Sequence, residues 1–325
     1  MRILAVDDDT IILELLTQFV AIMGDHELTT ALSGPEALDF VRKPATDHID
    51  CFLFDLQMPQ MDGVELTRRI RATSGYSDAP ILMLTAMSDK RYVDAAFSAG
   101  ATDYITKPFE FSELTARLGL VESLVRERKT LTKKVFASQA ASAKNQAEFI
   151  ELHEPVFIYD VENLIDYVAM QNYLAQLARG SLFGSTTFAF TIRQIKDHHR
   201  ALSAFDFTSL VADVAEVISD TLAGHQFLMS YAGGGTFLCV TESGWRPEMT
   251  VLMDAINLSL ARIELYNSQG EQLYVRVSAG EAMRLIWKSE SAVMDAVSAA
   301  YTSAEAASEA YERARASFWN GQVRA

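Results

Sequence analysis

Cysteine, positive charge and long apolar runs are all scarce in this sequence. Only two of its 325 residues are cysteines, and since Cys51 and Cys239 lie in apolar segments, we expect buried free thiols in a reducing cytoplasm. Lysine and arginine number 28 against 43 acidic residues, and the formal net charge of −15 argues against binding nucleic acid or an anionic membrane. No apolar run approaches the roughly 18 residues of a membrane span. The first residues also lack the pattern of a signal peptide, so we expect neither feature.

The first third of the chain alternates short apolar segments with amphipathic ones. The apolar segments have the length and composition of buried strands, and helical spacing follows each of them. We expect strands at 3–6, 27–31, 51–55, 81–85 and 103–105, and helices beginning near 10, 35, 64, 90 and 111. Repeated strand–helix units in about 120 residues predict an open, doubly wound five-stranded parallel sheet with helices on both faces.

Polar side chains stand at the ends of four of these strands. Asp7 and Asp8 follow the first strand, Asp55 ends the third, Thr85 ends the fourth and Lys107 follows the fifth. These ends converge on one edge of such a sheet. Close carboxylates repel by about 4 kcal/mol per pair at an effective dielectric near 20, so the cluster needs a cation, and Mg²⁺ suits oxygen ligands. The arrangement predicts phosphorylation of Asp55, with Mg²⁺ and Lys107 neutralising the developing charge.

Each of these features also has a purely structural interpretation. A run of aspartates after a strand is often a helix N-cap, and Lys107 before Pro108 is often only a turn. However, these polar residues all stand at the ends of the expected strands, and this combination favours a phosphorylation site over separate structural roles.

At this point the sequence resembles the receiver domain of two-component response regulators. The resemblance covers about residues 1–120 and is carried by the segments 6–8, 84–86 and 104–109, and by Asp55 followed by Pro59 and Gly63. It implies that Asp55 is the phosphoacceptor and that a histidine kinase or phosphotransfer protein is the donor.

The same resemblance implies roles for the neighbouring residues. Asp7, Asp8 and the backbone carbonyl of Gln57 are expected to hold Mg²⁺ together with Asp55. Thr85 and Tyr104 are expected to be the switch pair. Since a phosphoryl group adds charge that Thr85 reaches only by moving its loop, we expect Tyr104 to fill the vacated space and the helices from Lys90 and Phe111 to form the output face.

Residues 121–154 read as a helical linker. A heptad pattern continues past the receiver, with charges on the other faces. We expect a parallel coiled-coil homodimer through residues 121–138, and a solitary solvated helix is the alternative. The seam positions are Val121, Leu124, Arg128, Leu131, Val135 and Ser138.

Residues 155–325 show a different pattern of few strands and long helices. A glycine-rich turn separates two apolar segments that predict a hairpin. We expect an antiparallel sheet covered by helices. The expected strands are 187–195, 227–231, 236–241 and 273–279, with a strand or lead-in at 156–159; the expected helices are 164–177, 207–223, 248–265 and 291–318.

Three segments of this second part together resemble the GGDEF domain of diguanylate cyclases. They are 231–237, 275–282 and 307–315. Their order and separations are similar to those of the family, which implies the α+β fold of a cyclase palm. The signature turn is expected at Gly233, Gly234, Gly235, Thr236 and Phe237.

The departures from that family bear on catalysis. Cyclase chemistry needs carboxylates to hold metal against a triphosphate. Gly235 and Thr236 replace the acidic pair of the signature, Thr191 stands at the position of the first metal aspartate, and Arg193 replaces a second acid. The resemblance therefore implies a degenerate domain without enzymatic activity.

Three hypotheses for the second domain remain open. The first is a docking surface for an unknown downstream protein, or a control on dimerisation. The second is a sensor of GTP or cyclic di-GMP, bound through Gly233, Gly234, Lys196 and Arg315. The third is a diverged nucleotide cyclase with relocated metal ligands, for which the sequence offers no second acidic cluster.

Overall fold

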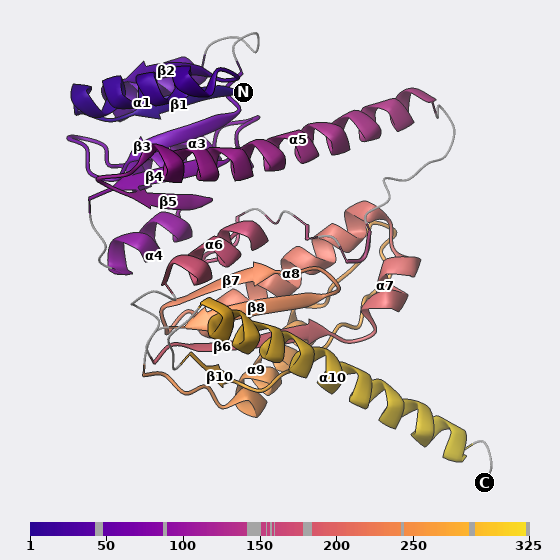
Figure 1. Ribbon diagram of the computed structural model, residues 1–325. Coiled ribbons are helices and arrows are strands. Elements are labelled where there is room, and N and C mark those ends of the chain that lie inside the picture. Colours follow the sequence, from indigo (N-terminus) through magenta and orange to yellow (C-terminus); the bar gives the residue numbers. More distant parts are fainter. Residues whose placement is uncertain are drawn as a thin grey trace. The chain divides into compact units, whose positions relative to one another are not determined.

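The computed structural model (Figure 1) divides into two compact units, residues 1–144 and 145–325, each of which is treated by itself. The backbone is described for residues 1–42, 48–86, 90–141, 151–153, 155–156, 158, 160–177, 184–241, 244–285 and 290–322. Side chains in these ranges are described except at 127–141, 290 and 315–322. None of the helices in the described ranges combines the length and hydropathy needed to cross a bilayer.

The sheet of the first unit has five parallel strands, as the sequence predicts. The strand order is β2-β1-β3-β4-β5, so the direction of winding reverses between β1 and β3. The carboxyl ends of strands at such a reversal are where open α/β sheets bind ligands. The strands are β1 (Arg2–Val6), β2 (Glu27–Ala31), β3 (Cys51–Asp55), β4 (Ile81–Thr85) and β5 (Asp103–Thr106).

Five helices cover the two faces of this sheet. Leu16 of α1 and Leu118 of α5 pack in one cluster with buried residues of the strands, including Leu53. On the other face, α2 and α4 both pack against α3. The helices are α1 (Thr10–Met23), α2 (Gly34–Val41), α3 (Gly63–Arg71), α4 (Lys90–Ser98) and α5 (Phe111–Ala141).

The course of α5 corrects one part of the linker prediction. Val121 and Val125 are 2% and 8% exposed and pack in the same core cluster as Leu118. Val121 therefore belongs to the core of the first unit and does not begin an intermolecular seam. The side chains of the later seam positions, from Arg128 to Ser138, lie outside the described residues.

The second unit contains an antiparallel sheet, as expected. Its strands run in the order β10-β6-β8-β7, and β9 pairs with the same strand β6. The hairpin has the predicted bounds. The strands are β6 (Thr186–Ile192), β7 (Phe227–Tyr231), β8 (Thr236–Thr241), β9 (Val277–Ala279) and β10 (Met283–Arg284).

Helices pack on both faces of this second sheet. Phe188 and Phe190 of β6 lie in a core cluster with Phe207 of α8 and Ile256 of α9. The helix α10 packs against β6, β8 and β9, and also against α6. The helices are α6 (Tyr167–Leu177), α7 (Ile195–Ala201), α8 (Ala204–Leu222), α9 (Met249–Ile263) and α10 (Glu290–Gln322).

The end of β6 differs from the sequence prediction. The apolar pattern predicted a strand to Ile195, but β6 ends at Ile192 and α7, which the prediction missed, begins at Ile195. Gln194 takes a left-handed conformation with φ of 56°, and its N–H donates to Glu312 Oε1 at 3.0 Å. Ile195 is buried by packing under the glycine turn rather than within the strand.

Three further element boundaries also differ. The helix predicted from 164 begins at Tyr167, because the carboxylate of Asp166 accepts the N–H of Val168 at 2.7 Å and starts the helix. The strand predicted from 273 is reduced to Val277–Ala279. Val156 and Ile158 pack against the core without forming a strand, and the two other residues of that predicted segment, 157 and 159, lie outside the described residues.

Candidate functional site

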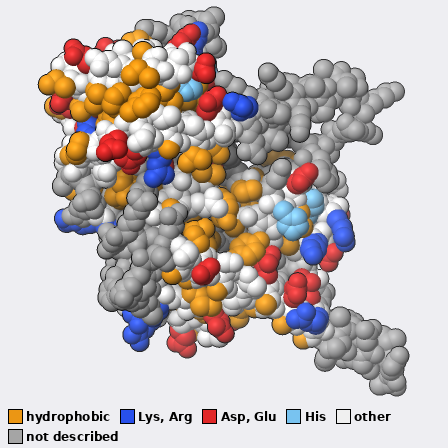
Figure 2. Space-filling model, viewed as in Figure 1, with side chains coloured by type: hydrophobic (Ala, Val, Ile, Leu, Met, Phe, Trp, Pro, Cys, Tyr) orange, Lys and Arg blue, Asp and Glu red, His pale blue; other side chains and the backbone are white. Residues whose placement is uncertain are grey.

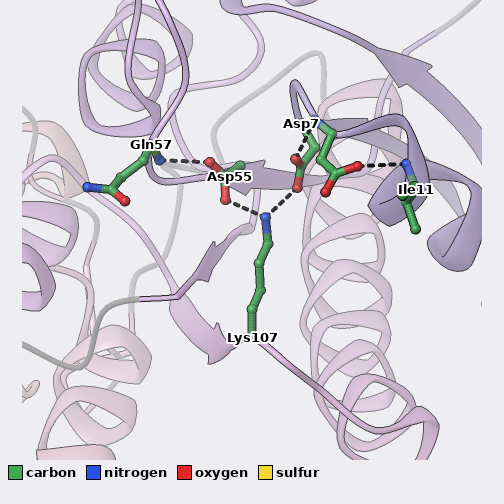
Figure 3. Close-up of polar contacts among 6 residues, drawn as sticks. Asp7, Ile11, Asp55, Gln57 and Lys107 are labelled. Atoms are coloured by element: carbon green, nitrogen blue, oxygen red, sulfur yellow. Dashed lines mark hydrogen bonds and ion pairs between the residues drawn. The ribbon is translucent and has the colours of Figure 1, made fainter.

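Asp55 lies at the carboxyl end of β3 and is only 6% exposed. Its Oδ2 accepts the backbone N–H of Gln57 at 2.8 Å (Figure 3). The loop returns immediately, because the N–H of Gly63 donates to the carbonyl of Leu56 at 3.0 Å. A Cβ at Gly63 would lie 2.3 Å from the carbonyl oxygen of Asp55, so only glycine fits here. The strand end and this close approach fix the carboxylate in place.

The three aspartates after β1 have different roles. Asp7 is 1% exposed, and its Oδ1 accepts the N–H of Asp9 at 3.0 Å. The Oδ1 of Asp9 accepts the N–H of Ile11 at 2.8 Å and caps α1. Asp8 is exposed. The N-cap interpretation that the sequence also allowed for this aspartate run thus holds for Asp9, the acid directly before the helix.

Lys107 joins the two buried carboxylates. Its Nζ donates to Asp7 Oδ2 at 2.6 Å and also to Asp55 Oδ1 (Figure 3). Burial alone lowers the pKa of Lys107, but the hydrogen bonds to Asp55 and Asp7 outweigh it, and the pKa is raised. Burial raises the pKa of Asp7, although the hydrogen bond from Lys107 opposes this. The ammonium group therefore stays charged and holds both carboxylates at the sheet edge.

The three predicted metal ligands are brought together. One carboxylate oxygen from each of Asp7, Asp8 and Asp55 lies within 4.8 Å of the others. Lys107 balances only part of their charge, and a set of carboxylate oxygens open to solvent at Asp8 is the donor chemistry that Mg²⁺ prefers. The residues thus fit a magnesium ion. For Gln57 the described contact is its N–H to Asp55, and the role of its carbonyl as a ligand stays a prediction.

The expected switch pair lies on adjacent strands. Thr85 ends β4 and is 3% exposed, and its carbonyl accepts the N–H of Lys107 at 2.7 Å. Tyr104 on β5 is 9% exposed and packs edge-on against Phe97 of α4, with ring centroids 6.2 Å apart. Tyr104 thus links the strand that ends next to the site with α4. Its switching role stays a prediction.

In the second unit, two positions at which the resemblance to cyclases implies acidic residues hold threonines. Thr191 on β6 lies opposite Thr236 on β8, and their Oγ1 atoms are hydrogen-bonded at 3.0 Å. Both side chains are buried, at 4% and 0% exposure. The hydroxyl of Tyr301 on α10 also bonds to Thr236. Burial and the nearby Glu305, to which Tyr301 is also hydrogen-bonded, raise the pKa of Tyr301 to about 12, so its hydroxyl stays neutral.

The glycine turn beside these threonines is closely packed. All three glycines have positive φ, 83° at Gly233, 61° at Gly234 and 81° at Gly235. A Cβ at Gly235 would lie 2.7 Å from Ile195, so a larger side chain does not fit without rearrangement. The N–H of Gly234 donates to the carbonyl of Leu152 at 2.7 Å. Phe237 is fully buried in the core.

The fold and the site of the first unit define a class: a doubly wound α/β domain with a buried aspartate, two further aspartates and a lysine gathered at the carboxyl ends of its strands. Residues 3–119 match the family described as response regulator receiver domain. This part of the chain is therefore the receiver domain of a two-component response regulator.

Individual relatives are similar to this chain over a stretch of comparable length. A protein named response regulator MprA from Mycobacterium avium is 42% identical over 118 residues, which are 36% of this chain and 49% of the relative. Its namesake from Mycobacterium leprae is 41% identical over 129 residues, which are 40% of this chain and 53% of that protein. The chain thus spans about half the length of the curated relatives it matches.

Two solved structures are also similar in sequence to part of this chain. The chemotaxis protein CheY4 of Vibrio cholerae is 33% identical, with a TM-score of 0.35, over 37% of this chain and 97% of that one. A response regulator from Chloroflexus aurantiacus is 38% identical, also with a TM-score of 0.35, over 37% and 95% of the two chains.

Proposed function

We propose that this protein is a response regulator whose receiver accepts a phosphoryl group on Asp55 from a histidine kinase or a phosphotransfer protein. The observation that carries the proposal is the convergence of Asp7, Asp8, Asp55 and Lys107 at the carboxyl ends of their strands. Location in the cytoplasm is part of the proposal, and the two free, buried cysteines support it.

The chemistry assigns a task to each side chain. A carboxylate oxygen of Asp55 forms the new bond to phosphorus while the bond from phosphorus to the donor breaks, and the electron pair stays with the donor. Asp7, Asp8 and Asp55 would hold Mg²⁺, which when bound neutralises charge on the phosphoryl oxygens. Lys107 supplies a fixed positive charge at the same place, and Thr85 ends the neighbouring strand and supplies a hydroxyl for the transferred group.

Intact-mass measurement after incubation with acetyl phosphate and Mg²⁺ tests the proposal. We expect the chain to gain one phosphoryl group, and Asp55→Asn to gain none. Asp62→Asn is the matched control, because Asp62 is an exposed N-cap on the same loop and asparagine still caps α3. Equal labelling of Asp55→Asn and the unmodified chain would contradict the assignment.

We propose that the second unit is a degenerate GGDEF-like domain that acts without catalysis, as a docking surface for a downstream protein or as a control on dimerisation. The mutual hydrogen bond between Thr191 and Thr236 supports this, because it satisfies the two hydroxyls without a metal. The packing of Ile195 against Gly235 supports it too, since an acidic side chain has no space there.

Turnover and binding assays separate this proposal from its alternatives. Any cyclic dinucleotide formed above background from GTP and Mg²⁺ or Mn²⁺ by the phosphorylated protein would refute the non-catalytic assignment and favour a diverged cyclase. Calorimetry with GTP and cyclic di-GMP tests the sensor alternative. That alternative uses Gly234, whose N–H already donates to Leu152, and we expect no heat of binding at millimolar nucleotide.

We propose that the chain forms a homodimer through the part of α5 that follows Val125. The seam then starts after the two valines that the receiver core uses. Sedimentation of phosphorylated and unphosphorylated protein measures this. We expect Leu131→Glu at a seam position to shift the protein toward monomer, and the adjacent Thr130→Glu on another helix face to have no such effect. Equal sedimentation of the two variants would contradict the seam.

A further inference from the structure

The second unit contains a cavity that the proposed function does not use. Its volume is about 390 Å³, within the range of small-molecule sites. It lies between the end of β6, the carboxyl end of α9, the segment before β9 and Tyr311 of α10. Apolar walls come from Leu260, Leu273 and Val275.

Arg193 holds a positive charge at the wall of this cavity. Its Nε donates to Ser278 Oγ at 2.9 Å, and its Nη2 donates to Met253 Sδ at 3.7 Å. The guanidinium carbon lies 3.8 Å from the ring centroid of Tyr311. Neither hydrogen-bond acceptor carries a charge, and among the described residues no carboxylate forms an ion pair with Arg193. A half-buried guanidinium held by neutral partners attracts an anion.

A second arginine lines the same space. Arg276 is exposed, and in the described part of the chain it forms no ion pair. Glu264 also lines the cavity, but its Oε2 accepts the hydroxyl of Tyr266 at 3.4 Å and pairs with neither arginine. The carboxyl end of α9 adds about half a negative charge. The cavity walls thus carry two arginines against Glu264 and this helix end, and the nearby carboxylate of Glu312 is already engaged, since it accepts the backbone N–H of Gln194 at 3.0 Å.

We propose that this cavity binds a small organic anion. The carboxylate or phosphate of the ligand would lie between Arg193 and Arg276, because a guanidinium pairs with either group through two parallel hydrogen bonds. The rest of the ligand is flat and apolar and lies along Leu260, Val275 and the ring of Tyr274, which is 81% exposed. This site is separate from Asp55 and does not depend on its phosphorylation.

Binding of defined probes to the full chain tests the proposal. Phenyl phosphate and phenylacetate are the anionic probes, and phenylacetamide is the neutral control of the same shape. Two readouts are combined: calorimetry, and the NMR signal of the Arg193 Nε–H, assigned with Arg193→Lys. We expect both anions, or one of them, to shift this signal and to bind at least about tenfold more tightly than phenylacetamide. The stronger anion identifies the preferred acid group.

Two variants test whether the anion binds in this cavity. We expect Arg276→Gln to weaken anion binding about tenfold with the unfolding temperature unchanged. The side chain of Arg276 is exposed and forms no hydrogen bond or ion pair with the described residues, and its backbone carbonyl, which accepts the N–H of Arg193, is kept in the variant. Arg200→Gln is the matched control, since Arg200 is exposed on α7 and 3.9 Å from Asp197, and it should leave binding unchanged. The proposal is overturned if phenylacetamide binds as tightly as the anions, if Arg276→Gln has no effect, or if the Arg193 signal does not move.

Discussion

The two sheets of this protein satisfy their clustered polar side chains in different ways. At the edge of the first sheet, Asp7 and Asp55 share the ammonium group of Lys107, and Asp8 adds a further exposed carboxylate. In the second sheet, the hydroxyl groups of Thr191 and Thr236 are hydrogen-bonded to each other. Lys107 balances only part of the charge of three carboxylates held this close, so a further cation is favoured there, whereas the two hydroxyls are satisfied within the protein. The comparison separates a charged cluster that fits a cation from a pair of hydroxyls that is satisfied by hydrogen bonds within the protein.

The largest effect on ligand binding should follow from weakening the acidic cluster. Asp8→Asn removes one carboxylate without disturbing the buried pair, since Asp8 is exposed. Two unit charges about 4 Å apart attract by about 4 kcal/mol at an effective dielectric of 20, and even part of that for a divalent ion predicts about a hundredfold lower Mg²⁺ affinity. Phosphorylation by acetyl phosphate should then need correspondingly more Mg²⁺. An unchanged Mg²⁺ requirement would remove Asp8 from the site.

The next effect concerns a carboxylate placed where the second unit has a hydroxyl. Thr191→Asp puts a charge at a position that is 4% exposed and has only hydroxyl partners. We expect the free energy of unfolding to fall by about 3–5 kcal/mol, as for an uncompensated buried charge. Thr191→Asn, which is similar in size and uncharged, is the control and should cost less. If Mg²⁺ or Mn²⁺ restored the stability of Thr191→Asp, the second site would still be a metal site and the contrast would fail.

The same contrast explains how much of the structure can be predicted from the sequence alone. The strands of the receiver have strong apolar runs that end in polar residues, so their bounds and the cluster around Asp55 follow from periodicity and topology. The second unit was harder, because an apolar residue does not show which neighbour will bury it. Ile195 looked like the end of a strand, but Gln194 turns the chain and Ile195 packs against Gly235.

Tertiary contacts explain two further features that could not be predicted from the sequence. The heptad pattern of the linker begins within the receiver, because Val121 fits both a coiled-coil seam and a domain core, and only the packing distinguishes them. The cavity between Arg193 and Arg276 joins residues 83 positions apart in sequence. No local pattern indicates such a pairing, so only the folded chain could reveal it.

A smaller effect tests whether the threonine pair is complete in itself. Thr236→Val leaves the Thr191 hydroxyl buried without its partner, which should cost about 1–3 kcal/mol of unfolding free energy. Thr191→Val should cost less, since Thr236 keeps its bond to Tyr301. In the double valine variant no orphan hydroxyl remains on either strand, so it should be more stable than the sum of the single effects predicts. Strict additivity of the two changes in chemical denaturation would mean that the hydroxyls do not interact.

The smallest effect concerns a carboxylate of the second unit that is held by hydrogen bonds instead of a cation. Asp206 accepts the hydroxyl of Ser203 at 2.7 Å and the N–H and hydroxyl of Ser268 at 2.8 and 3.0 Å. The bond from Ser203, followed by that from the Ser268 backbone, lowers the pKa of Asp206 below its usual 3.8. Its ionised form therefore stabilises the fold above that pH, and the contribution is lost as the pH falls through the lowered pKa.

Asp206→Asn is thus expected to lower the unfolding temperature near neutral pH and to match the unmodified chain more closely in strong acid. Ser203→Ala should show the same pH dependence, because it removes the hydrogen bond that lowers the pKa most. A constant difference across this pH range would mean that the charge of Asp206 does not matter. A carboxylate can therefore be stable in this protein with hydroxyl and amide donors alone, and what distinguishes the Asp7, Asp8 and Asp55 cluster is the crowding of three such groups within reach of one cation.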